Sequence, residues 1–294
     1  MTQEFVVVGD VMTDVVAQAT RSLRYGSDTS ASISTHGGGG GANTAAWLAD
    51  AGAGVALVGR VGDDALGRGA LDELRRTGVS LFVTVDQVTA TGTCVVVVGP
   101  DGERSMLPDA GANASLVPAD LPDAVFRAGA HLHLSGYTLL NGGSMLAGLA
   151  ALDLARLRSM TVSVDPASSG PLTDVGVDRF LSWIDGVDLI LANESEACVL
   201  GGTDDALAAG QRLTERYANV IVKLGREGAT WFQRDAAPVR SPALAVSVVD
   251  TTGAGDAFAA GLIASWHGGA DPATALAEAN RRAGLAVSRV GARP

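Results

Sequence analysis

Two aspartates frame a glycine-rich turn near the C-terminal end of the sequence, in the run Asp250-Thr-Thr-Gly-Ala-Gly-Asp256. Gly253 and Gly255 allow the backbone to approach a ligand closely. The residues that follow have a helical pattern, and the first N–H groups of a helix have no acceptor within the helix. A turn of this kind at the start of a helix predicts a site for an anion such as a phosphate.

Asp256 would lie in the positive field at the start of this helix, which favours the ionised carboxylate. An ionised carboxylate beside an anion site can accept the proton of an attacking hydroxyl group. This pairing suits phosphoryl transfer, in which positioning and charge stabilisation supply most of the catalysis. The run alone is equally consistent with a helix cap that has no catalytic role. The candidate catalytic residues are Asp256 as base, with Gly253, Ala254 and Gly255 as the anion hole.

A second glycine run, residues 37–41, precedes Asn43 and a helical pattern over residues 44–51. Glycines let a hydroxylated ligand lie directly on backbone N–H groups, and the amide of Asn43 both donates and accepts hydrogen bonds. A flexible linker is the alternative, but a linker would not lead directly into a helix. The substrate-binding candidates of this loop are Gly38, Gly39, Gly40 and Asn43.

Short apolar runs alternate with helical patterns along most of the chain, beginning with the strand-like residues 5–8. This alternation predicts βαβ units, a mostly parallel central sheet, and helices on both faces of that sheet. Ligands bind such sheets beyond the carboxyl ends of the strands. Further strands are expected over residues 55–58, 131–134, 161–164, 189–191, 220–223 and 245–249, and helices over residues 42–51, 66–77, 144–157, 206–217 and 256–266.

Two more polar segments, within residues 11–36 and 89–110, predict a small sheet apart from this core, with a turn at Gly99-Pro-Asp-Gly102. We expect this sheet to close over the substrate as a lid that excludes water. Its exposed edges predict a homodimer formed through the lid. Residues 1–294 are expected to form a single α/β domain with this appendage.

Charge and cysteine content exclude several classes of protein. The formal net charge is −11 and the basic residues form no stripe, so nucleic acid is not an expected partner. Cys94 and Cys198 are too few for a disulfide framework or a thiolate zinc site. The first residues lack a signal-peptide pattern and no apolar run is long enough to span a membrane, so a cytoplasmic protein without a membrane partner is expected.

The segment D-T-T-G-A-G-D-A-F, residues 250–258, resembles the C-terminal motif of the ribokinase-like (PfkB) carbohydrate kinases, and the similarity extends from Gly9 to Pro294. The resemblance implies a ribokinase-like fold and ATP-dependent transfer of the γ-phosphoryl group to a hydroxyl of a sugar or sugar derivative. It also implies Mg²⁺ and potassium as cofactors. Asp14 matches a carboxylate that accepts hydrogen bonds from substrate hydroxyls, although on its own it could be a solvated turn residue.

The same resemblance assigns residues to the nucleotide and to metal ions. Glu196 would order water around the magnesium ion, although Asn193 and Glu196 could also be a helix cap. Lys223 could meet a phosphate or could be a surface lysine at the end of a strand. The nucleotide-binding candidates are Asn193, Lys223, Gly225, Gly228 and Asn280. The monovalent-cation candidates, mostly through backbone carbonyl groups, are Asp250, Thr252, Ala286, Arg289 and Gly291.

Three positions depart from the ribose-phosphorylating members of the family. Met12, Gly40 and Ser135 stand where those members have asparagine, lysine and glutamate. The loss of three polar partners argues that ribose is not the preferred substrate. A sugar, sugar acid or sugar phosphate fits the low aromatic content of 4%, and Arg104 is a candidate for binding a substrate phosphate.

Two alternatives remain open. Tyr137 could stack on a ring, so an adenosine- or pseudouridine-like nucleoside kinase is the alternative within the family. Outside the family, the alternative is a non-catalytic nucleotide- or sugar-binding Rossmann-like module, which is disfavoured because no G-x-G-x-x-G follows the first strand. His131 and His133, two residues apart in a strand, are interpreted as packing residues.

Overall fold

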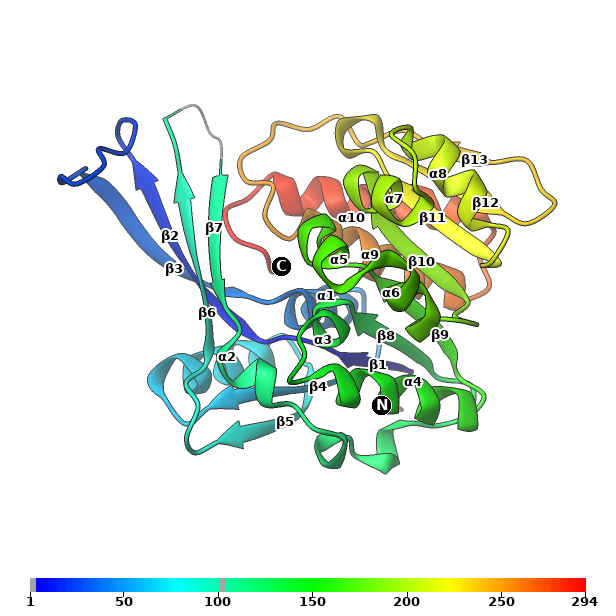
Figure 1. The fold of residues 1–294 in the computed structure, drawn as a ribbon, viewed down its shortest axis with the longest axis horizontal. Helices are drawn as coiled ribbons and strands as arrows, with labels where there is room; N and C mark the ends of the chain where they lie inside the picture. Colours follow the sequence, from blue (N-terminus) through cyan, green and yellow to red (C-terminus); the bar gives the residue numbers. More distant parts are fainter. Residues whose placement is uncertain (1–3, 101–103) are drawn as a thin grey trace.

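A nine-stranded sheet runs through the protein in the computed structural model, which describes residues 4–100 and 104–294 (Figure 1). Its strands are β1 (Phe5–Val8), β4 (Val55–Gly62), β5 (Ser80–Asp86), β8 (His131–Ser135), β9 (Thr161–Asp165), β10 (Leu189–Asn193), β11 (Asn219–Lys223), β12 (Ala229–Gln233) and β13 (Val239–Ser241). Their order is β13-β12-β11-β10-β9-β8-β1-β4-β5, and the pairs from β11 to β5 are parallel. β12 and β13 extend one edge antiparallel. The predicted mostly parallel sheet is confirmed.

Successive side chains of a fully buried strand point to opposite sides, so both faces of this sheet are apolar. Helices cover both of these faces. Val6 and Val8 of β1 belong to one hydrophobic core, and Phe5 and Val7 belong to the other. The helices are α1 (Gly40–Asp50), α2 (Ala65–Arg76), α3 (Tyr137–Leu140), α4 (Met145–Leu157), α5 (Ser169–Val175), α6 (Val177–Trp183), α7 (Glu194–Gly201), α8 (Ala206–Leu213), α9 (Ala254–His267) and α10 (Pro272–Val287). Helices α1, α9 and α10 enclose the core that contains Phe5, and α4 and α8 pack on the opposite core.

A separate four-stranded sheet stands beside this layered body, as predicted (Figure 1). It consists of β2 (Met12–Ala19), β3 (Ala31–Gly38), β6 (Gly92–Val98) and β7 (Arg104–Asp109), in the order β3-β2-β6-β7. We call this sheet the lid. Strand β1 leads directly into β2 of the lid instead of into a helix, unlike the first βαβ unit of a dinucleotide-binding fold. The turn expected at residues 99–102 lies partly outside the described residues.

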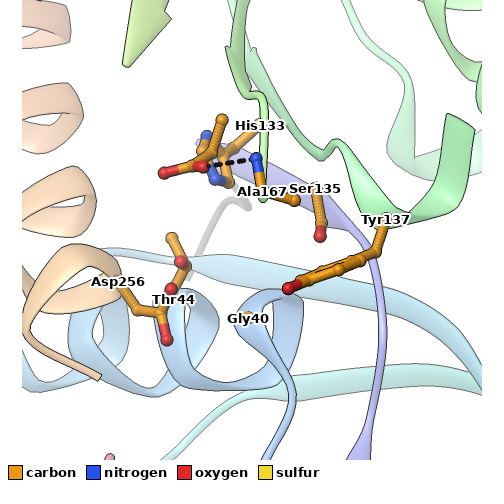
Figure 2. A pocket seen from close by; sticks show the side chains of 8 residues that line it. Gly40, Thr44, His133, Ser135, Tyr137, Ala167 and Asp256 are labelled. Carbon is orange, nitrogen blue, oxygen red and sulfur yellow. Dashed lines mark hydrogen bonds between the residues drawn. The ribbon is translucent and has the colours of Figure 1, made fainter. Parts of the chain in front are cut away.

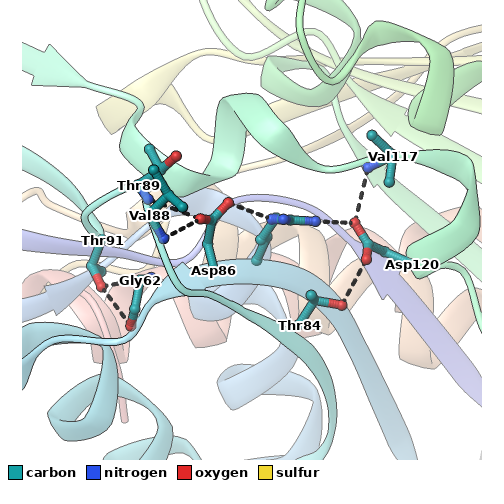
Figure 3. A network of polar contacts seen from close by, with 9 residues as sticks. Gly62, Thr84, Asp86, Val88, Thr89, Thr91, Val117 and Asp120 are labelled. Carbon is teal, nitrogen blue, oxygen red and sulfur yellow. Dashed lines mark hydrogen bonds and ion pairs between the residues drawn. The ribbon is translucent and has the colours of Figure 1, made fainter.

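A polar network anchors the base of the lid to the edge of the large sheet (Figure 3). Arg60 of β4 donates hydrogen bonds to Asp86 and Asp120, each at 2.9 Å. Asp86 in turn accepts from the backbone N–H groups of Val88 and Thr89, both at 2.8 Å. These two residues belong to the segment that leads from β5 into β6, so the guanidinium of Arg60 fixes the path by which the chain enters the lid.

One predicted strand is absent. Residues 245–249 pair with no strand in the described part of the chain, and Val248 and Val249 are 64% and 56% exposed. The N–H groups of Val249 and Asp250 donate instead to the carbonyl of Val287 at the end of α10. The apolar residues of this segment alternate as in a strand. Because no neighbouring strand pairs with it, the segment is extended but forms no strand-to-strand hydrogen bonds.

The glycine run is also not the loop that we expected. Gly38 ends β3, Gly39 makes the turn with a φ of 92°, and α1 begins at Gly40. These glycines permit close packing of backbone on backbone, since a Cβ on Gly41 would lie 2.6 Å from the Cα of Gly9.

Within residues 4–100 and 104–294, no helix has the length and apolar character needed to cross a membrane.

Candidate functional site

Asp256 lies in the first turn of α9, directly after the glycine turn. Gly253 precedes the helix with a φ of 75°, and a Cβ there would lie within 2.7 Å of the backbone and side chain of Ala292. The turn therefore requires glycine, which explains the spacing of the motif. Burial, together with the carboxylates of Asp165 and Asp10, raises the pKa of Asp256 to about 8 against the opposing effects of Asn43 and Lys223.

Asn43 connects the two glycine-containing segments that the sequence singled out. Its Nδ2 donates to Oδ2 of Asp256 at 2.8 Å, across 213 residues of sequence. Its Oδ1 accepts from Nε of Arg293 at 3.2 Å, and Arg293 also donates to the carbonyl of Gly38 at 2.8 Å. Arg293 thereby sets which end of the Asn43 amide faces Asp256. Nothing in the spacing of the sequence pointed to Arg293, which is 7% exposed and forms an ion pair with Glu73.

A cavity of about 60 Å³ opens beside Asp256 (Figure 2). The labelled residues come from α1, β8, α3, α9 and the loop between β9 and α5, and Figure 2 shows Tyr137 and Asp256 reaching toward this space from different elements. His133, interpreted from the sequence as a packing residue, is 2% exposed but lines the cavity. The lining residues are Gly40, Thr44, His133, Ser135, Tyr137, Asp165, Ala167 and Asp256.

Carboxylates hold the substrate side of the site together. Asp10 accepts hydrogen bonds from the N–H of Gly40 and from the hydroxyl of Ser135, both at 2.9 Å. Asp14 lies on β2 against Gly38, where a Cβ would collide with its carboxylate. Burial raises the pKa of Asp14 to about 6, partly offset by Arg293. Sequence reasoning missed Asp10, whose position at the end of a buried strand was the available signal.

Lys223, one of the predicted nucleotide residues, forms a largely buried ion pair. Lys223 ends β11, and its Nζ lies 2.6 Å from Oδ2 of Asp165 at the end of β9. A Cβ on Gly255 would lie 3.6 Å from the same Nζ, so the lysine also faces the glycine turn. Lys223 is therefore not a surface lysine; its side chain is 14% exposed. Asp165 was missed, although it too is a polar residue at the carboxyl end of a parallel strand.

Asn193 and Glu196 form a capping box at the start of α7, and Glu196 is 1% exposed. Burial raises the pKa of Glu196 to about 7, and the nearby Asp165 adds to the effect while Lys223 opposes it. Oxygen ligands of this kind suit Mg²⁺, which keeps several of its waters and needs few direct protein contacts. Both oxygens of the Glu196 carboxylate accept hydrogen bonds from Asn193, one from its backbone N–H and one from its Nδ2, so a magnesium ion near Glu196 would be held through its waters and not by direct ligation.

Two of the remaining nucleotide candidates, Asn280 and Gly228, lie against Ser241 at the end of β13. Asn280 of α10 donates to the carbonyl of Ser241 at 3.1 Å. Gly228 has a φ of 92°, and a Cβ there would collide with the same carbonyl oxygen. Gly225 starts the turn between β11 and β12 with a φ of 54°. Asn280 and Gly228 therefore lie together at this end of β13, and Gly225 lies in the turn that leads to Gly228.

Among the monovalent-cation candidates, the carboxylate of Asp250 already has partners within the protein. Oδ1 of Asp250 accepts from the N–H of Thr252 at 2.8 Å, and Oδ2 accepts from the N–H of Gly291 at 3.1 Å. The guanidinium of Arg104 lies 2.8 Å from Oδ1 as well. Burial alone would raise the pKa of Asp250, but these partners hold it below its ordinary value. The carbonyl of Ala286 already accepts from the N–H of Arg289 at 3.3 Å.

Comparison with known proteins agrees with this geometry. The family model described as pfkB family carbohydrate kinase matches residues 2–294. An ATP-dependent ribose-1-phosphate kinase of Halopiger xanaduensis is 34% identical over 87% of this chain and 82% of its own. A fructokinase of Klebsiella pneumoniae is 34% identical over 82% of this chain and 80% of its own.

The crystal structure of an adenosine kinase from Sinorhizobium meliloti superposes with a TM-score of 0.90 and 26% identity, and the match covers 100% of this chain and 96% of that one. The central sheet and the smaller sheet are thus features of a shared fold. The match over nearly the whole sequence shows that the chain belongs to the pfkB family of carbohydrate kinases, enzymes that transfer a phosphoryl group to an alcohol.

Proposed function

We propose that the chain is an ATP-dependent kinase that phosphorylates a hydroxyl group of a sugar or sugar derivative, with Asp256 as the base. The observation that carries this proposal is the position of Asp256, whose carboxylate follows the glycine turn and borders the 60 Å³ cavity. A substrate hydroxyl in that cavity lies within reach of the carboxylate. The first N–H groups of α9 have no acceptor inside the helix, so they are available to bind an anion at the glycine turn.

Each part of the site has one role in this proposal. Asp256 takes the proton of the attacking hydroxyl, and residues 253–255 stabilise the charge that develops on the transferred group. Asn43 holds the Asp256 carboxylate in place at 2.8 Å. The lid covers the substrate and keeps water away from the phosphoryl group.

ATP would bind beyond the carboxyl ends of β10 and β11, where Asn193, Lys223, Gly225, Gly228 and Asn280 lie. The ribose-1-phosphate kinase relative is named as ATP-dependent, which supports this assignment. Bound magnesium would neutralise phosphate charge near Glu196. Lys223 faces Gly255 and is held by Asp165, so it can orient a phosphate without moving.

The residues that line the cavity favour a small polyol over a nucleoside. Of its eight lining residues, Tyr137 is the one aromatic, and the others are mostly polar or small. Ribose is not the preferred sugar in this proposal, because the hydroxyl of Ser135 is already bound to Asp10 and Met12 offers no polar partner. A nucleoside is the second candidate, since Tyr137 is 43% exposed and a structural neighbour is an adenosine kinase.

An ADP-release assay across a panel of acceptors separates these candidates. The panel comprises fructose, ribose, ribose 1-phosphate, sugar acids, adenosine and pseudouridine, each with magnesium and ATP. We expect the highest kcat/KM with a sugar or sugar derivative other than ribose. A higher kcat/KM with a nucleoside would favour the second candidate, and release of ADP that no acceptor stimulates would refute the kinase proposal.

The lid also supports a proposal about assembly. Three exposed apolar side chains lie on one face of the lid by the register of its strands: Ile33 (68%), Val95 (37%) and Leu107 (65%). A second lid packed against these residues would remove them from water, so we propose a homodimer through the lid. Size-exclusion chromatography with light scattering tests this, and a monomer over the accessible concentration range would contradict it.

A further inference from the structure

Arg104, the first residue of β7, reaches out of the lid to the segment that precedes the catalytic turn. Its guanidinium lies 2.8 Å from Oδ1 of Asp250 and donates to the hydroxyls of Thr251 at 2.7 Å and Thr252 at 3.1 Å. The side chains of Arg104 and Asp250 are 23% and 16% exposed, so the pair is largely shielded from water. In Figure 1, β7 is the lid strand that faces the C-terminal part of the chain.

This contact involves Asp250 and Thr252, two of the five residues to which the family resemblance assigned a monovalent cation. Among the five candidate ligands, Asp250 is the one that carries a negative charge. Both of its carboxylate oxygens are engaged, by the N–H groups of Thr252 and Gly291 and by Arg104. A second positive ion beside this carboxylate would be repelled by a guanidinium that already satisfies its charge.

We propose that Arg104 takes the place of a monovalent cation at Asp250, so that closure of the lid itself supplies the positive charge that orders residues 250–252. An arginine suits this role because its charge is permanent and its planar group can bind three acceptors at once. Arg104 is a positioning residue, because it acts through Asp250 and the two threonines. Thr252 directly precedes Gly253, so order in this segment is passed to the turn that places Asp256.

Lid closure and assembly of the anion turn are coupled in this arrangement. When the lid opens, Arg104 leaves and Asp250 loses its counter-charge. The turn then lacks the contact that fixes its first residues, and the enzyme is competent for transfer mainly when the lid is closed. This inference rests on the proposed kinase activity, but the charge replacement at Asp250 can be tested without turnover.

The first measurement is thermal unfolding of wild type, Arg104→Gln and the control Arg21→Gln in potassium chloride and in choline chloride at equal ionic strength. Arg21 is an exposed arginine of the lid region, between β2 and β3. We expect potassium to raise the Tm of Arg104→Gln relative to choline, because an ion that binds the folded state stabilises it. Wild type and the control should unfold at the same temperature in both salts. If potassium raises the Tm of wild type as much as it raises the Tm of Arg104→Gln, the proposal is overturned.

The second measurement is the turnover of the same proteins and of Arg104→Lys with the best acceptor. Wild type should be equally active in potassium, sodium and choline salts. In Arg104→Gln, kcat should fall on the order of 10- to 100-fold. This fall is smaller than the largest losses of kcat seen when a residue that contacts the oxyanion directly is removed. Potassium or added guanidinium ion should restore part of that loss, and Arg104→Lys should retain more activity than Arg104→Gln.

Two outcomes of the second measurement contradict the proposal: strong activation of wild type by potassium, or Arg104→Gln with unchanged turnover in choline. If wild type phosphorylates no acceptor, the kinase proposal fails on its own. The salt dependence of the Tm then still decides whether Arg104 replaces a cation.

Discussion

The free-energy cost of keeping Asp256 ionised inside the protein should be measurable as a pH-dependent stability difference. The pKa of this carboxyl is raised from 3.8 to about 8, chiefly by burial. Between these values the folded state retains a proton that the unfolded state has lost, so the free energy of unfolding falls as pH rises through this window. The substitution Asp256→Asn removes the titrating group while nearly preserving the shape of the side chain, and it abolishes this part of the fall.

The magnitude follows from the size of the shift. A rise of roughly four pKa units, at ~1.4 kcal/mol per unit, gives an upper bound of ~6 kcal/mol above the folded pKa. Because the side chain is partly exposed, we expect a smaller gain, on the order of 2–4 kcal/mol. At about pH 5 the carboxyl is protonated in the folded state, so most of the difference should be absent there.

Urea unfolding of wild type and Asp256→Asn at about pH 5 and about pH 9 provides the assay. The difference between the two proteins should grow with pH in favour of the variant. The matched control is Asp174→Asn, at an exposed position on α5, whose effect should not change with pH. A stability difference between wild type and Asp256→Asn that is the same at both pH values would refute the reasoning.

Three further predictions concern the base, the buried ion pair and the lid. Because the base must be ionised, kcat/KM should rise with pH. The substitution Asn43→Ala removes a hydrogen bond that lowers the pKa of Asp256, so it should move this rise to higher pH. A pH profile that does not move would show that Asn43 does not tune the base. Lys223→Met strands the buried carboxylate of Asp165 and should cost ~3–5 kcal/mol in urea unfolding. The double variant with Asp165→Asn should regain much of that loss, and equal losses in both proteins would contradict a coupled pair. Ile33→Asp should convert the proposed dimer to a monomer in light scattering, and a dimer that persists would place the interface elsewhere.

Local patterns predicted the parts of the fold that depend on local physics. The buried run at residues 5–8 and the glycine turn before Asp256 occur where the sequence placed them, because continuous apolar runs and glycine turns follow from neighbouring residues. The strand predicted over residues 245–249 failed because a strand also needs a partner, and the partner here is the end of α10. Pairing of this kind is a tertiary property that periodicity does not contain.

The site was predictable in its motif residues and not in the groups that position them. Asp256 and Asn43 were both identified, but their contact spans 213 residues of sequence. Arg293 reaches Asn43 across 250 residues, and Arg104 reaches Thr251 across 147. An isolated arginine carries no periodic or spacing signal, so its partners become visible only when the chain is folded.

The most direct test of the proposed mechanism is the turnover of Asp256→Asn with the best acceptor found in the ADP-release panel. Loss of the base should lower kcat by on the order of 10²- to 10⁴-fold while the protein remains folded and at least as stable as wild type near neutral pH. A variant that retains turnover close to that of wild type would contradict the assignment of Asp256 as the catalytic base.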